Sequence, residues 1–296
     1  MYLFFLLDSH LAKNIDTDGP DNSLFAIEGW QIFVDNKISF LDFPLITTSP
    51  KFNLPTETVD LPSQGRLYPK ESPLSSGKVE MKYMTAKEED ILSNINYIRK
   101  GTALDRVLKS LITDKKVKFD ELLIGDKNAI MVAARLLSYG KDYVFDYAGE
   151  QRTVDLSKID PLPLSSEFKN ASKNEFEFTL PKSGNKVVFK ILTQKDESGI
   201  EREVTGRQKI DKDSNTDGST RLKYMLVSVN GNSESKDIRD FVDNYLLASD
   251  ARALRKYYKE ISPDVDLKFT YENADGGEEE VDLPIGVTFF WPDFRL

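Results

Sequence analysis

Apolar residues in the first half of the chain recur at helical spacing. The residues that share one face of the first expected helix are Ile91, Leu92, Ile95 and Ile98. Thr85 and Glu88 precede them in the Ser/Thr-x-x-Glu form of a capping box, which predicts where this helix begins. Gly101 is expected to end it, because glycine accepts the left-handed backbone that often closes a helix.

Two further helices are predicted before residue 140. Thr102 is expected to cap one of them, whose apolar stripe is Leu104, Val107, Leu108, Leu111 and Ile112. Asp126 is expected to cap the next, from about residue 127 to residue 139, and Gly140 to stop it. Ile130 to Ala134 is apolar nearly all round, which predicts a central, buried helix. Arg135 within it either extends to solvent or pairs with an acid.

From residue 142 the pattern changes to the alternation that is typical of strands. Tyr143–Tyr147 and Thr153–Leu156 flank Ala148-Gly149-Glu150 and predict a hairpin. A second hairpin is predicted around Ser183-Gly184-Asn185. Its strands are Phe176 to Leu180, with apolar residues at alternate positions, and Val187 to Leu192.

The last hundred residues mix both patterns. The first expected elements are a polar helix at 193–209, a loop at 211–220 and a strand or buried helix at 222–229. Two helices follow: the first has Ile238, Phe241, Val242, Tyr245 and Leu246 on one face, and the second is capped by Ser249, directs Leu254, Tyr257, Tyr258 and Ile261 inward and ends at Pro263. The last expected elements are strands at 266–271, 278–283 and 287–291. Asp275-Gly276-Gly277 is the expected turn between the first two of these strands.

These elements predict an α+β fold with a helical core, an inserted small β subdomain and a strand-rich C-terminal end. The expected divisions are an N-terminal arm and linker (1–55), the helical part of the core (56–140), the β subdomain (141–192), and C-terminal helices and strands (193–296). Residues 1–55 carry apolar clusters separated by turn sequences and then several prolines, which predicts short strands or an extended arm.

Composition narrows the available chemistry. The chain has 296 residues, 40% of them hydrophobic, no cysteine and a single histidine, His10. Thiol nucleophiles, disulfides and cysteine-ligated zinc are therefore excluded, and a Ser-His-Asp triad or histidine metal cluster would have to use His10. The net charge of −9 argues against a broad nucleic-acid-binding surface. We expect no cofactor.

No segment has the length of a membrane span. The apolar run Tyr2 to Leu7 is short, lacks basic residues before it and is interrupted by Asp8. A spanning helix needs about 20 apolar residues, and a signal peptide needs a longer apolar core with a cleavage site. We therefore expect a soluble protein without an export signal.

One segment fits half of a calcium-binding loop. Asp213-Ser-Asn-Thr-Asp-Gly218 places oxygen ligands Asp213, Asn215 and Asp217 at alternate positions before a glycine. The acid expected at the twelfth position is replaced by Tyr224. The same residue types make ordinary polar turns, so we expect no metal site, and a calcium-dependent binding module stays an alternative.

The sequence gives no positive sign of catalysis. Glu278, Glu279 and Glu280 form an acidic run that is expected to be a solvated face, and no phosphate-binding or nucleophile motif is present. A carboxylate-based hydrolase of the cell wall is a remaining alternative that rests only on the number of acids. We expect a protein that is not an enzyme.

Four phrases in order resemble a known family. They are Leu61-Pro-Ser-Gln-Gly-Arg-Leu-Tyr-Pro69, Met84 to Leu92, Gly125 to Tyr143, and Phe289-Phe-Trp-Pro-Asp293. Together they resemble the baseplate hub and hub-assembly proteins of T-even-type bacteriophages, whose tails are contractile. Asp250 to Leu254 and Ile261 to Asp266 resemble the penultimate helix of that family and the exit from it. Many relatives carry a Cys-x-x-Cys pair where this chain has Tyr271 to Ala274.

The resemblance implies a structural role. It implies a subunit or assembly factor of the baseplate hub, located in the virion tail baseplate and in the host cytoplasm during assembly. Its partners would be other hub and tail proteins in a hetero-oligomeric complex, without nucleic acid. The predicted contact surfaces are the N-terminal arm, the first phrase with Leu61, Pro62, Gly65 and Tyr68, and a terminal strand with Phe289, Phe290 and Trp291. Residues 1–55 precede the usual start of the family and are either an added arm or upstream sequence.

Overall fold

The structure is a computed structural model, and it describes residues 31–34, 37–40, 54–211, 216–272 and 277–290. The chain divides into two compact units, Met1–Asn53 and Leu54–Leu296, each of which is described by itself. In the first unit, β1 (Gln31–Val34) and β2 (Lys37–Phe40) pair as an antiparallel hairpin. Short strands were one of the two forms predicted for this region.

The second unit has two hydrophobic cores. The first core forms from residues 61–156 and again from 265–290. In chain order the elements of this part are β3 (Thr56–Asp60), η2 (Pro73–Ser76), β4 (Lys78–Lys82), α1 (Ala86–Leu92), α2 (Ile95–Arg99), α3 (Ala103–Leu111), η3 (Phe119–Glu121), α4 (Ile124–Tyr139), β5 (Asp142–Tyr147), β6 (Glu150–Asp155), η4 (Leu156–Lys158), β10 (Lys268–Glu272), β11 (Glu278–Asp282) and α10 (Val287–Phe290).

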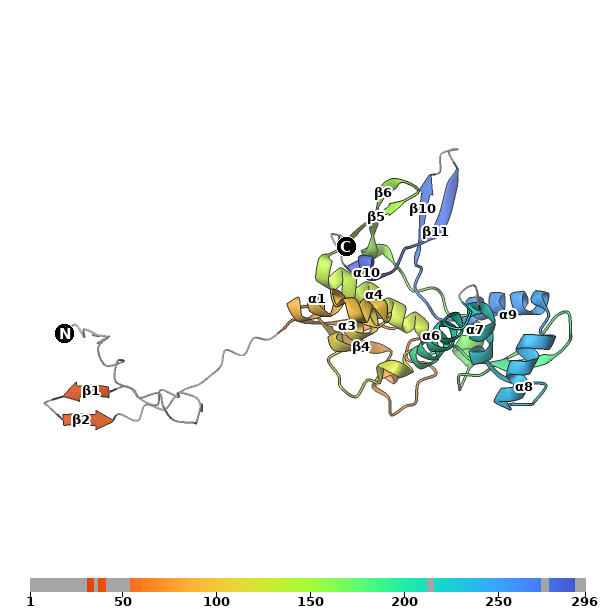
Figure 1. Ribbon diagram of the computed structural model, residues 1–296, viewed down its shortest axis with the longest axis horizontal. Coiled ribbons are helices and arrows are strands. Elements are labelled where there is room, and N and C mark those ends of the chain that lie inside the picture. Colours follow the sequence, from red (N-terminus) through yellow and green to blue (C-terminus); the bar gives the residue numbers. More distant parts are fainter. Residues whose placement is uncertain (1–30, 35–36, 41–53, 212–215, 273–276, 291–296) are drawn as a thin grey trace. The chain divides into compact units, whose positions relative to one another are not determined.

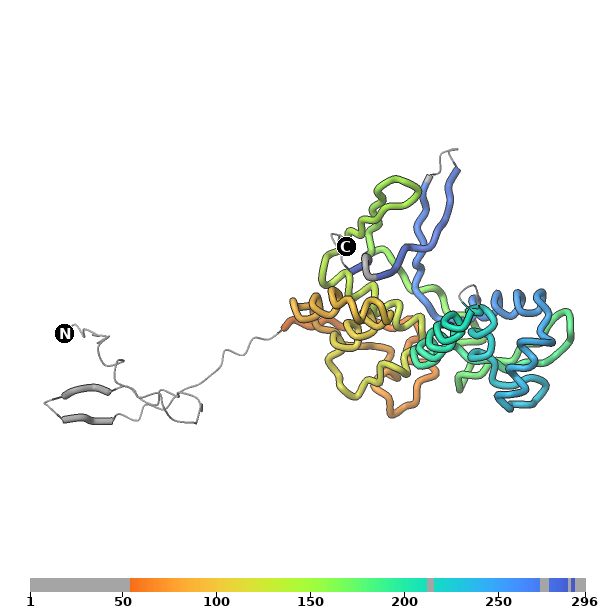
Figure 2. The backbone as a smooth tube through the Cα atoms, viewed as in Figure 1, coloured from red at the N-terminus to blue at the C-terminus, as the bar shows by residue number. Residues whose placement is uncertain are grey.

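The second core forms mainly from residues 168–261. Its elements are α5 (Ser166–Asn170), β7 (Phe176–Thr179), β8 (Lys186–Phe189), α6 (Gln194–Gln208), α7 (Asp217–Met225), β9 (Leu226–Val229), α8 (Ser235–Asp240), the π-helical turn η5 (Phe241–Tyr245) and α9 (Ala248–Ile261). The chain thus builds most of the first core, completes the second, and returns to the first beside α4 (Figure 2). Helices with small antiparallel sheets confirm the predicted α+β class.

Several local predictions are confirmed. The carboxylate of Glu88 accepts a hydrogen bond from the N–H of Thr85, and the side chain of Thr85 accepts one from the N–H of Glu88, as a capping box requires. The apolar stripe of α3 faces the first core, and α4 is buried along most of its length. Both alternatives predicted for Arg135 were wrong. It is buried and donates to the carbonyl oxygens of Gly140 and Asp142, at 3.3 and 3.2 Å, and no acid pairs with it in the part of the chain that the structure describes.

The helix predicted from Thr85 to Gly101 is two helices, so that prediction was wrong in length. The side chain of Asn94 accepts hydrogen bonds from the N–H groups of Asn96 and Tyr97 and starts α2 anew. Asparagine competes with helical backbone bonding in this way, which interrupts the helix. Ile95 consequently points outward and is 56% exposed.

Two hairpins, β5–β6 and β10–β11, lie side by side beyond the helices (Figure 1). Ala148 and Gly149 between β5 and β6 both have positive φ, which is the requirement of a tight hairpin turn. Phe145 packs edge-on against Phe269, with ring centroids 5.0 Å apart. The strands of the predicted β subdomain lie in two different sheets, β5-β6 and β7-β8-β9. The division at residues 141–192 stays a prediction.

The predicted terminal strand at 287–291 is a helical turn in the described residues, so this prediction was wrong. The N–H of Phe289 donates to the carbonyl of Gly286 at 3.1 Å. Phe289 and Phe290 are both fully buried in the first core, where Phe289 lies 4.8 Å from the ring of Tyr143. A strand would direct successive rings to opposite faces, whereas a helical turn brings both into one core. Trp291 lies outside the described residues.

The boundaries of the later helices also differ from the predictions. α7 begins at Asp217, inside the predicted loop, and ends at Met225, and β9 begins at the next residue, Leu226. The segment 222–229 is thus helix first and strand afterwards. Leu247 rather than Ser249 precedes α9. The turn predicted at 275–277 lies mostly outside the described residues.

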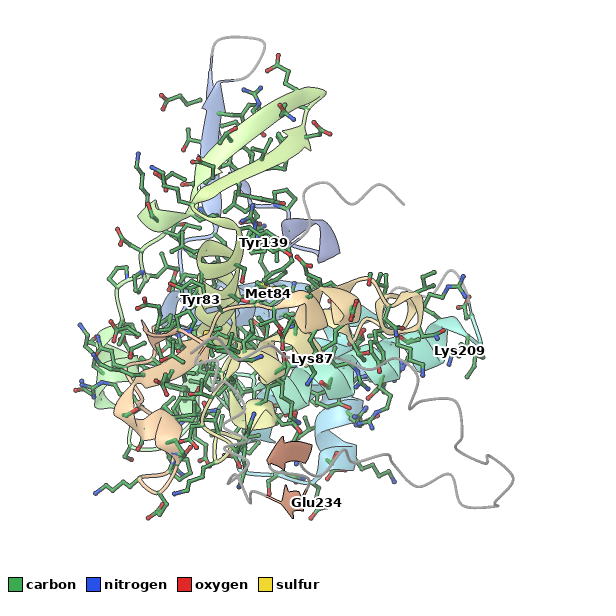
Figure 3. The ribbon with its side chains drawn as sticks, turned by 90° about the vertical axis from the view of Figure 1, so that its left-hand side faces the viewer. Tyr83, Met84, Lys87, Tyr139, Lys209 and Glu234 are labelled. Atoms are coloured by element: carbon green, nitrogen blue, oxygen red, sulfur yellow. The ribbon has the colours of Figure 1, made fainter. Side chains whose placement is uncertain are left out.

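Side chains of α1 and α4 meet at the far end of α4. Tyr139, in the last turn of α4, donates to the carboxylate of Glu89 in α1 at 3.2 Å. Figure 3 labels Tyr139 together with Met84 and Lys87, which lie before and within α1. Among the described residues, no helix combines the length and the apolar character that a membrane crossing demands.

Candidate functional site

The first turn of α4 is held by groups from distant parts of the chain. Leu123 occupies the N-cap position and has no polar side chain with which to bind the free N–H groups. Instead, the N–H of Leu123 donates to the hydroxyl of Tyr68 at 2.8 Å, and the N–H of Ile124 donates to the carbonyl of Leu192 at 3.2 Å. Asp126, predicted as the cap, is the third helical residue, so that prediction was wrong.

Asp126 is fully buried and faces the segment Leu61 to Pro69. Its Oδ1 accepts the N–H of Ser63 at 2.9 Å, and its Oδ2 accepts the hydroxyls of Ser63 and Tyr68, both at 2.6 Å. The carboxylate is therefore turned away from its own helix toward a segment about sixty positions earlier. This contact explains why it does not cap.

No cation pairs with Asp126 among the described residues. Burial raises the pKa of the Asp126 carboxyl, and the hydrogen bonds from Ser63 and Tyr68 only partly oppose this. Burial, together with the adjacent carboxylate, also raises the pKa of the Tyr68 hydroxyl far above its ordinary value. The positive end of the α4 dipole lies at this turn and favours the negative charge.

Gly125 and Asn128 join α4 to the end of α9. A Cβ atom on Gly125 would lie 1.8 Å from the carbonyl oxygen of Pro263, so only glycine allows this backbone approach. The side-chain amide of Asn128 donates to Asp264 at 3.0 Å. Burial raises the pKa of Asp264 as well.

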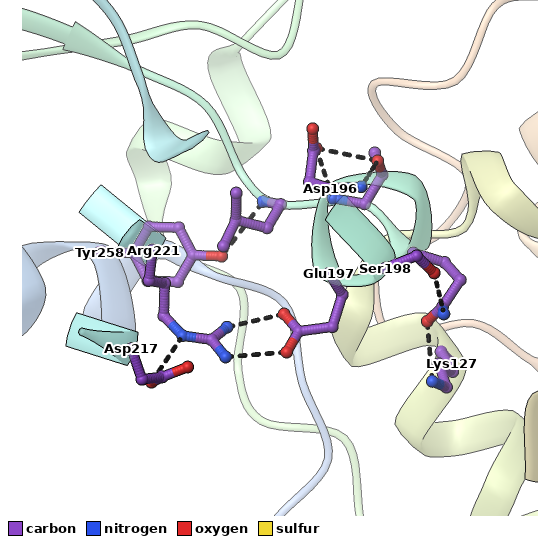
Figure 4. A network of polar contacts seen from close by, with 10 residues as sticks. Lys127, Asp196, Glu197, Ser198, Asp217, Arg221 and Tyr258 are labelled. Atoms are coloured by element: carbon purple, nitrogen blue, oxygen red, sulfur yellow. Dashed lines mark hydrogen bonds and ion pairs between the residues drawn. The ribbon is translucent and has the colours of Figure 1, made fainter. Parts of the chain in front are cut away.

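Lys127 completes a closed polar triangle with α3 and α6. Its ammonium lies 2.6 Å from Asp105 and donates to the side chain of Gln194 at 2.7 Å. The amide of Gln194 in turn donates to Asp105 at 2.6 Å. Figure 4 shows Lys127 at one end of this network and, on the other side of α6, Glu197 paired with Arg221 through two hydrogen bonds.

Each residue from 123 to 128 thus contacts a segment outside α4. We call these six residues and their partners the α4 junction. Leu123 belongs to the second core and Ala129 to the first, so the junction lies where the two cores meet. It fixes the segments 61–69, 192–194 and 263–264 relative to one helix.

The segment that Asp126 holds is a closed loop. The N–H of Leu61 donates to the carbonyl of Gly77 at 2.8 Å. Gly65 and Gly77 both have positive φ, and a Cβ atom on Gly65 would lie 2.4 Å from the carbonyl oxygen of Ser75. Glycine at these positions lets the two ends of the loop pack together.

A groove of about 720 Å³ lies beside this loop, and we call it the proline groove. Its lining residues are Asp60, Leu61, Pro62, Gln64, Ser76, Gly77 and Lys78 on one wall and Asp160, Pro161, Leu162, Pro163, Leu164 and Lys169 on the other. The second wall is fixed by hydrogen bonds between Asp160 and Asp266 and between Leu162 and Asp264. Both walls are therefore tied to the α4 junction or to residues next to it.

The stretch that contains these contacts matches a known protein family. The family described as T4 bacteriophage base plate protein matches residues 55–291, which includes the α4 junction and both walls of the groove. The chain belongs to this family. Searches of curated proteins and of solved structures found no match. The family makes this chain a structural protein of the bacteriophage baseplate, which lies in the tail of the virion.

Three phrases that carried the resemblance place a buried acid at the third position of a helix in this baseplate protein. Glu88 in α1 accepts from Thr85, Lys82 and Ser110, and Asp126 in α4 accepts from Ser63 and Tyr68. The third acid is Asp250 in α9, which accepts hydrogen bonds from the N–H groups of Lys182 and Ser183, at 2.7 and 3.0 Å. These phrases therefore specify internal anchors of the fold.

The predicted contact residues are distributed unevenly. Leu61, Pro62 and Gly65 are buried, and Tyr68 is half-buried at the α4 junction. The structure brings these residues together but places Phe289 and Phe290 in the first core, near Tyr143. Their role as contact surfaces stays a prediction.

Sequence reasoning missed Ser63 and Asp126 as a pair. A usable signal was the run Gly125-Asp-Lys-Asn128, in which four residues poor in apolar character open an otherwise apolar helix. A buried helix begins with such residues only when other segments satisfy them.

The calcium alternative gains no support from the described residues. Asp213 and Asn215 lie outside them, and Asp217 lies 3.7 Å from the guanidinium of Arg221. Within residues 54–211, 216–272 and 277–290, no group of three or more acids or histidines is arranged to hold a metal ion. The acidic run at 278–280 lies on the exposed strand β11, where Glu279 accepts the hydroxyl of Tyr271 and Glu280 pairs with Lys268.

Proposed function

We propose that this baseplate protein is a subunit or an assembly factor of the central hub. It acts by docking other hub and tail proteins in a hetero-oligomeric complex that forms in the host cytoplasm. It does so without catalysis and without nucleic acid. The observation that carries the proposal is the proline groove, one wall of which is the Leu61 to Pro62 phrase that resembles hub proteins.

The geometry of the groove supports a role in docking. A surface that must recognise a partner needs walls that keep their shape, because ordering them on binding would cost free energy. Asp126 and Gly77 hold the first wall, and Asp264 and Asp266 hold the second. Leu162 is 37% exposed and offers apolar area between the walls.

The proposed contact surfaces are narrower than the sequence predicted. Leu61 and Pro62 would contact a partner through the groove, while Gly65 and Tyr68 would hold the wall in place. Phe289 and Phe290 are buried, so a partner there would meet the surface beside them. Trp291, which lies outside the described residues, remains a proposed contact. Residues 1–55 remain a proposed arm for a neighbouring subunit.

The experiment is a mass-spectrometric inventory of purified tails and of free hub complexes, made with the native chain and with Pro163→Asp. Pro163 is exposed in the groove wall, so the substitution should leave melting unchanged and deplete the chain from hub complexes. The matched control is Pro181→Asp, at an exposed proline in the turn of the β7–β8 hairpin. It should behave as the native chain.

If the native chain is present in finished tails at a fixed ratio to other baseplate proteins, it is a subunit. If it is present only in free hub complexes, it is an assembly factor. Its absence from both contradicts the proposal. If Pro163→Asp is incorporated as well as the native chain, the proline groove is not the docking surface. Release of peptidoglycan fragments by the purified chain would contradict the absence of catalysis.

A further inference from the structure

A second groove lies between α7 and α9, and the function proposed above does not use it. It has a volume of about 440 Å³ and is lined mainly by apolar surface. Leu192, Leu222, Met225 and Tyr258 form its apolar lining, and Leu162 lies at its edge. We call it the α7–α9 groove. A hollow of this size admits one or two apolar side chains of a partner.

The rim of this groove is cationic in a protein whose net charge is −9. Arg255 and Lys259 stand one turn apart on α9, and Arg221 stands on α7. Arg221 is already neutralised, because it binds both carboxylate oxygens of Glu197, at 2.7 and 2.8 Å. No ion pair joins Arg255 or Lys259 to an acid in the described part of the chain.

Two acids also line the groove, and neither forms an ion pair with Arg255 or Lys259 in the described part of the chain. Asp217 lies 3.7 Å from Arg221 in the next turn of α7. Asp264 is half-buried and accepts hydrogen bonds from Asn128 and from the N–H of Val265. The charge of Lys259 acts to lower the pKa of Asp264 against the larger effect of burial, so Lys259 is partly offset and Arg255 is not. Arg255 and, to a lesser extent, Lys259 are the charges that an incoming group would meet.

We propose that the α7–α9 groove binds a segment of another tail protein that presents an apolar side chain next to a carboxylate. The apolar side chain lies against Leu222, Met225 and Tyr258, and the carboxylate lies between Arg255 and Lys259. Charge complementarity selects an acidic partner segment, and burial of the apolar side chain supplies the affinity. The identification of the partner as a tail protein rests on the proposed function, whereas the chemistry of the groove does not.

The first test uses small probes and the full chain. The chain has five methionines, and ¹³C-methyl labelling makes Met225 a reporter inside the groove, assigned with Met225→Leu. We expect 3-phenylpropionate to shift the Met225 signal saturably. Its uncharged amide should bind about threefold more weakly, because one exposed ion pair is lost. Acetate and inorganic phosphate should give no shift.

Matched variants separate the rim from the rest of α9. Arg255→Ala with Lys259→Ala should reduce the affinity for 3-phenylpropionate to that of the amide. Arg252→Ala with Lys256→Ala also removes two positive charges from α9, but from exposed positions that do not line the groove. This variant should bind 3-phenylpropionate with the affinity of the native chain. Equal binding of acid and amide, or an equal shift with phosphate, overturns the proposal.

The second test concerns the partner. Phage carrying Arg255→Glu with Lys259→Glu should lose the chain from hub complexes while the purified variant keeps its melting temperature. If 3-phenylpropionate binds but this variant is incorporated normally, the assignment of a tail protein as occupant is overturned and the hub role stands. If the native chain is absent from hub complexes and tails while the probe still binds, the proposed function fails and the groove chemistry stands.

Discussion

Glu88 and Asp126 occupy the same third position of two helices, and both are fully buried, yet they are anchored differently. Glu88 binds residues near it in sequence and on α3, and the ammonium of Lys82 lies 2.8 Å away. Asp126 binds Ser63 and Tyr68, from a distant segment, and has no cation among the described residues. The first carboxylate stabilises a helix end, whereas the second holds two parts of the chain together.

The pKa values of Glu88 and Asp126 are shifted in opposite directions. Burial acts to raise the pKa of Glu88, but Lys82 and the hydrogen bonds from Thr85 and Ser110 outweigh it and hold the pKa at about 2. At Asp126 burial prevails, and the pKa is raised. At Glu88 a cation and neutral donors together outweigh the cost of burying the charge, whereas at Asp126 the neutral donors orient the carboxylate without outweighing that cost.

The largest expected effect comes from the residue beside Asp126. Gly125→Ala places a methyl group 1.8 Å from the carbonyl oxygen of Pro263, and backbone cannot turn aside as a side chain can. We expect a loss of at least about 3 kcal/mol in the free energy of unfolding, or no folded protein. Urea denaturation measures it.

The control for this change is Gly206→Ala, near the end of α6. A Cβ atom there meets nothing within 4 Å, so this variant should gain about 0.5–1 kcal/mol. Similar stability of the two variants would contradict the close approach at the α4 junction.

The next largest losses of stability are expected when either carboxylate is removed. Asp126→Ala leaves three donors of Ser63 and Tyr68 without an acceptor in a buried place, and should cost about 4 kcal/mol. Glu88→Ala should cost about 2 kcal/mol, because the side chain of Lys82 is 22% exposed and can turn to water. Urea denaturation of both variants gives the difference, and a larger loss for Glu88→Ala would reverse the comparison.

Acid should act on the two carboxylates in opposite directions. The pKa of Glu88 is lowered in the folded state, so its contribution is complete above its ordinary value of 4.5 and is lost as pH falls toward about 2. The pKa of Asp126 is raised, so its protonation on folding favours the folded state as pH falls toward its ordinary value of 3.8.

The measurement is the free energy of unfolding of the native chain, Glu88→Gln and Asp126→Asn from about pH 7 to about pH 3. The deficit of Glu88→Gln relative to the native chain should shrink with acid, and that of Asp126→Asn should grow. Parallel curves for all three proteins would contradict both pKa directions.

The sequence predicted the features that depend on neighbouring residues better than those that depend on residues far apart in the chain. The capping box at Thr85, the Ala148-Gly149 turn and the stripe of α3 are signals within a few residues, and all were predicted correctly. Asn94 was a local signal too, but its competition with the helix depends on which hydrogen bonds the fold leaves available.

The α4 junction could not be predicted in the same way. Asp126 and Ser63 are separated by 63 positions, and Gly125 needs glycine only because Pro263 reaches it in the folded chain. The turn at Phe289 and Phe290 was misread because a short aromatic run fits a strand as well as a helix. Tertiary packing decided between them, and the sequence pattern does not contain that packing.

A smaller loss of stability is expected from removing the hydroxyl of Tyr68, which links Asp126 to the N–H of Leu123. Tyr68→Phe keeps the ring and removes one donor and one acceptor, so it should cost about 1–2 kcal/mol in urea denaturation. Tyr83→Phe is the matched control, since the contact of that hydroxyl within the described residues is an exposed one of 3.5 Å with Glu57, and it should change stability by less than about 0.5 kcal/mol.

Ser63→Ala combined with Tyr68→Phe refines this test. Both hydroxyls donate to the same carboxylate oxygen, so the double variant should deviate from the sum of the single losses by about 0.5–1 kcal/mol. Strict additivity would mean that Asp126 binds the two residues independently. The distant anchor would then consist of two separate contacts, and the contrast with Glu88 would lie only in the cation.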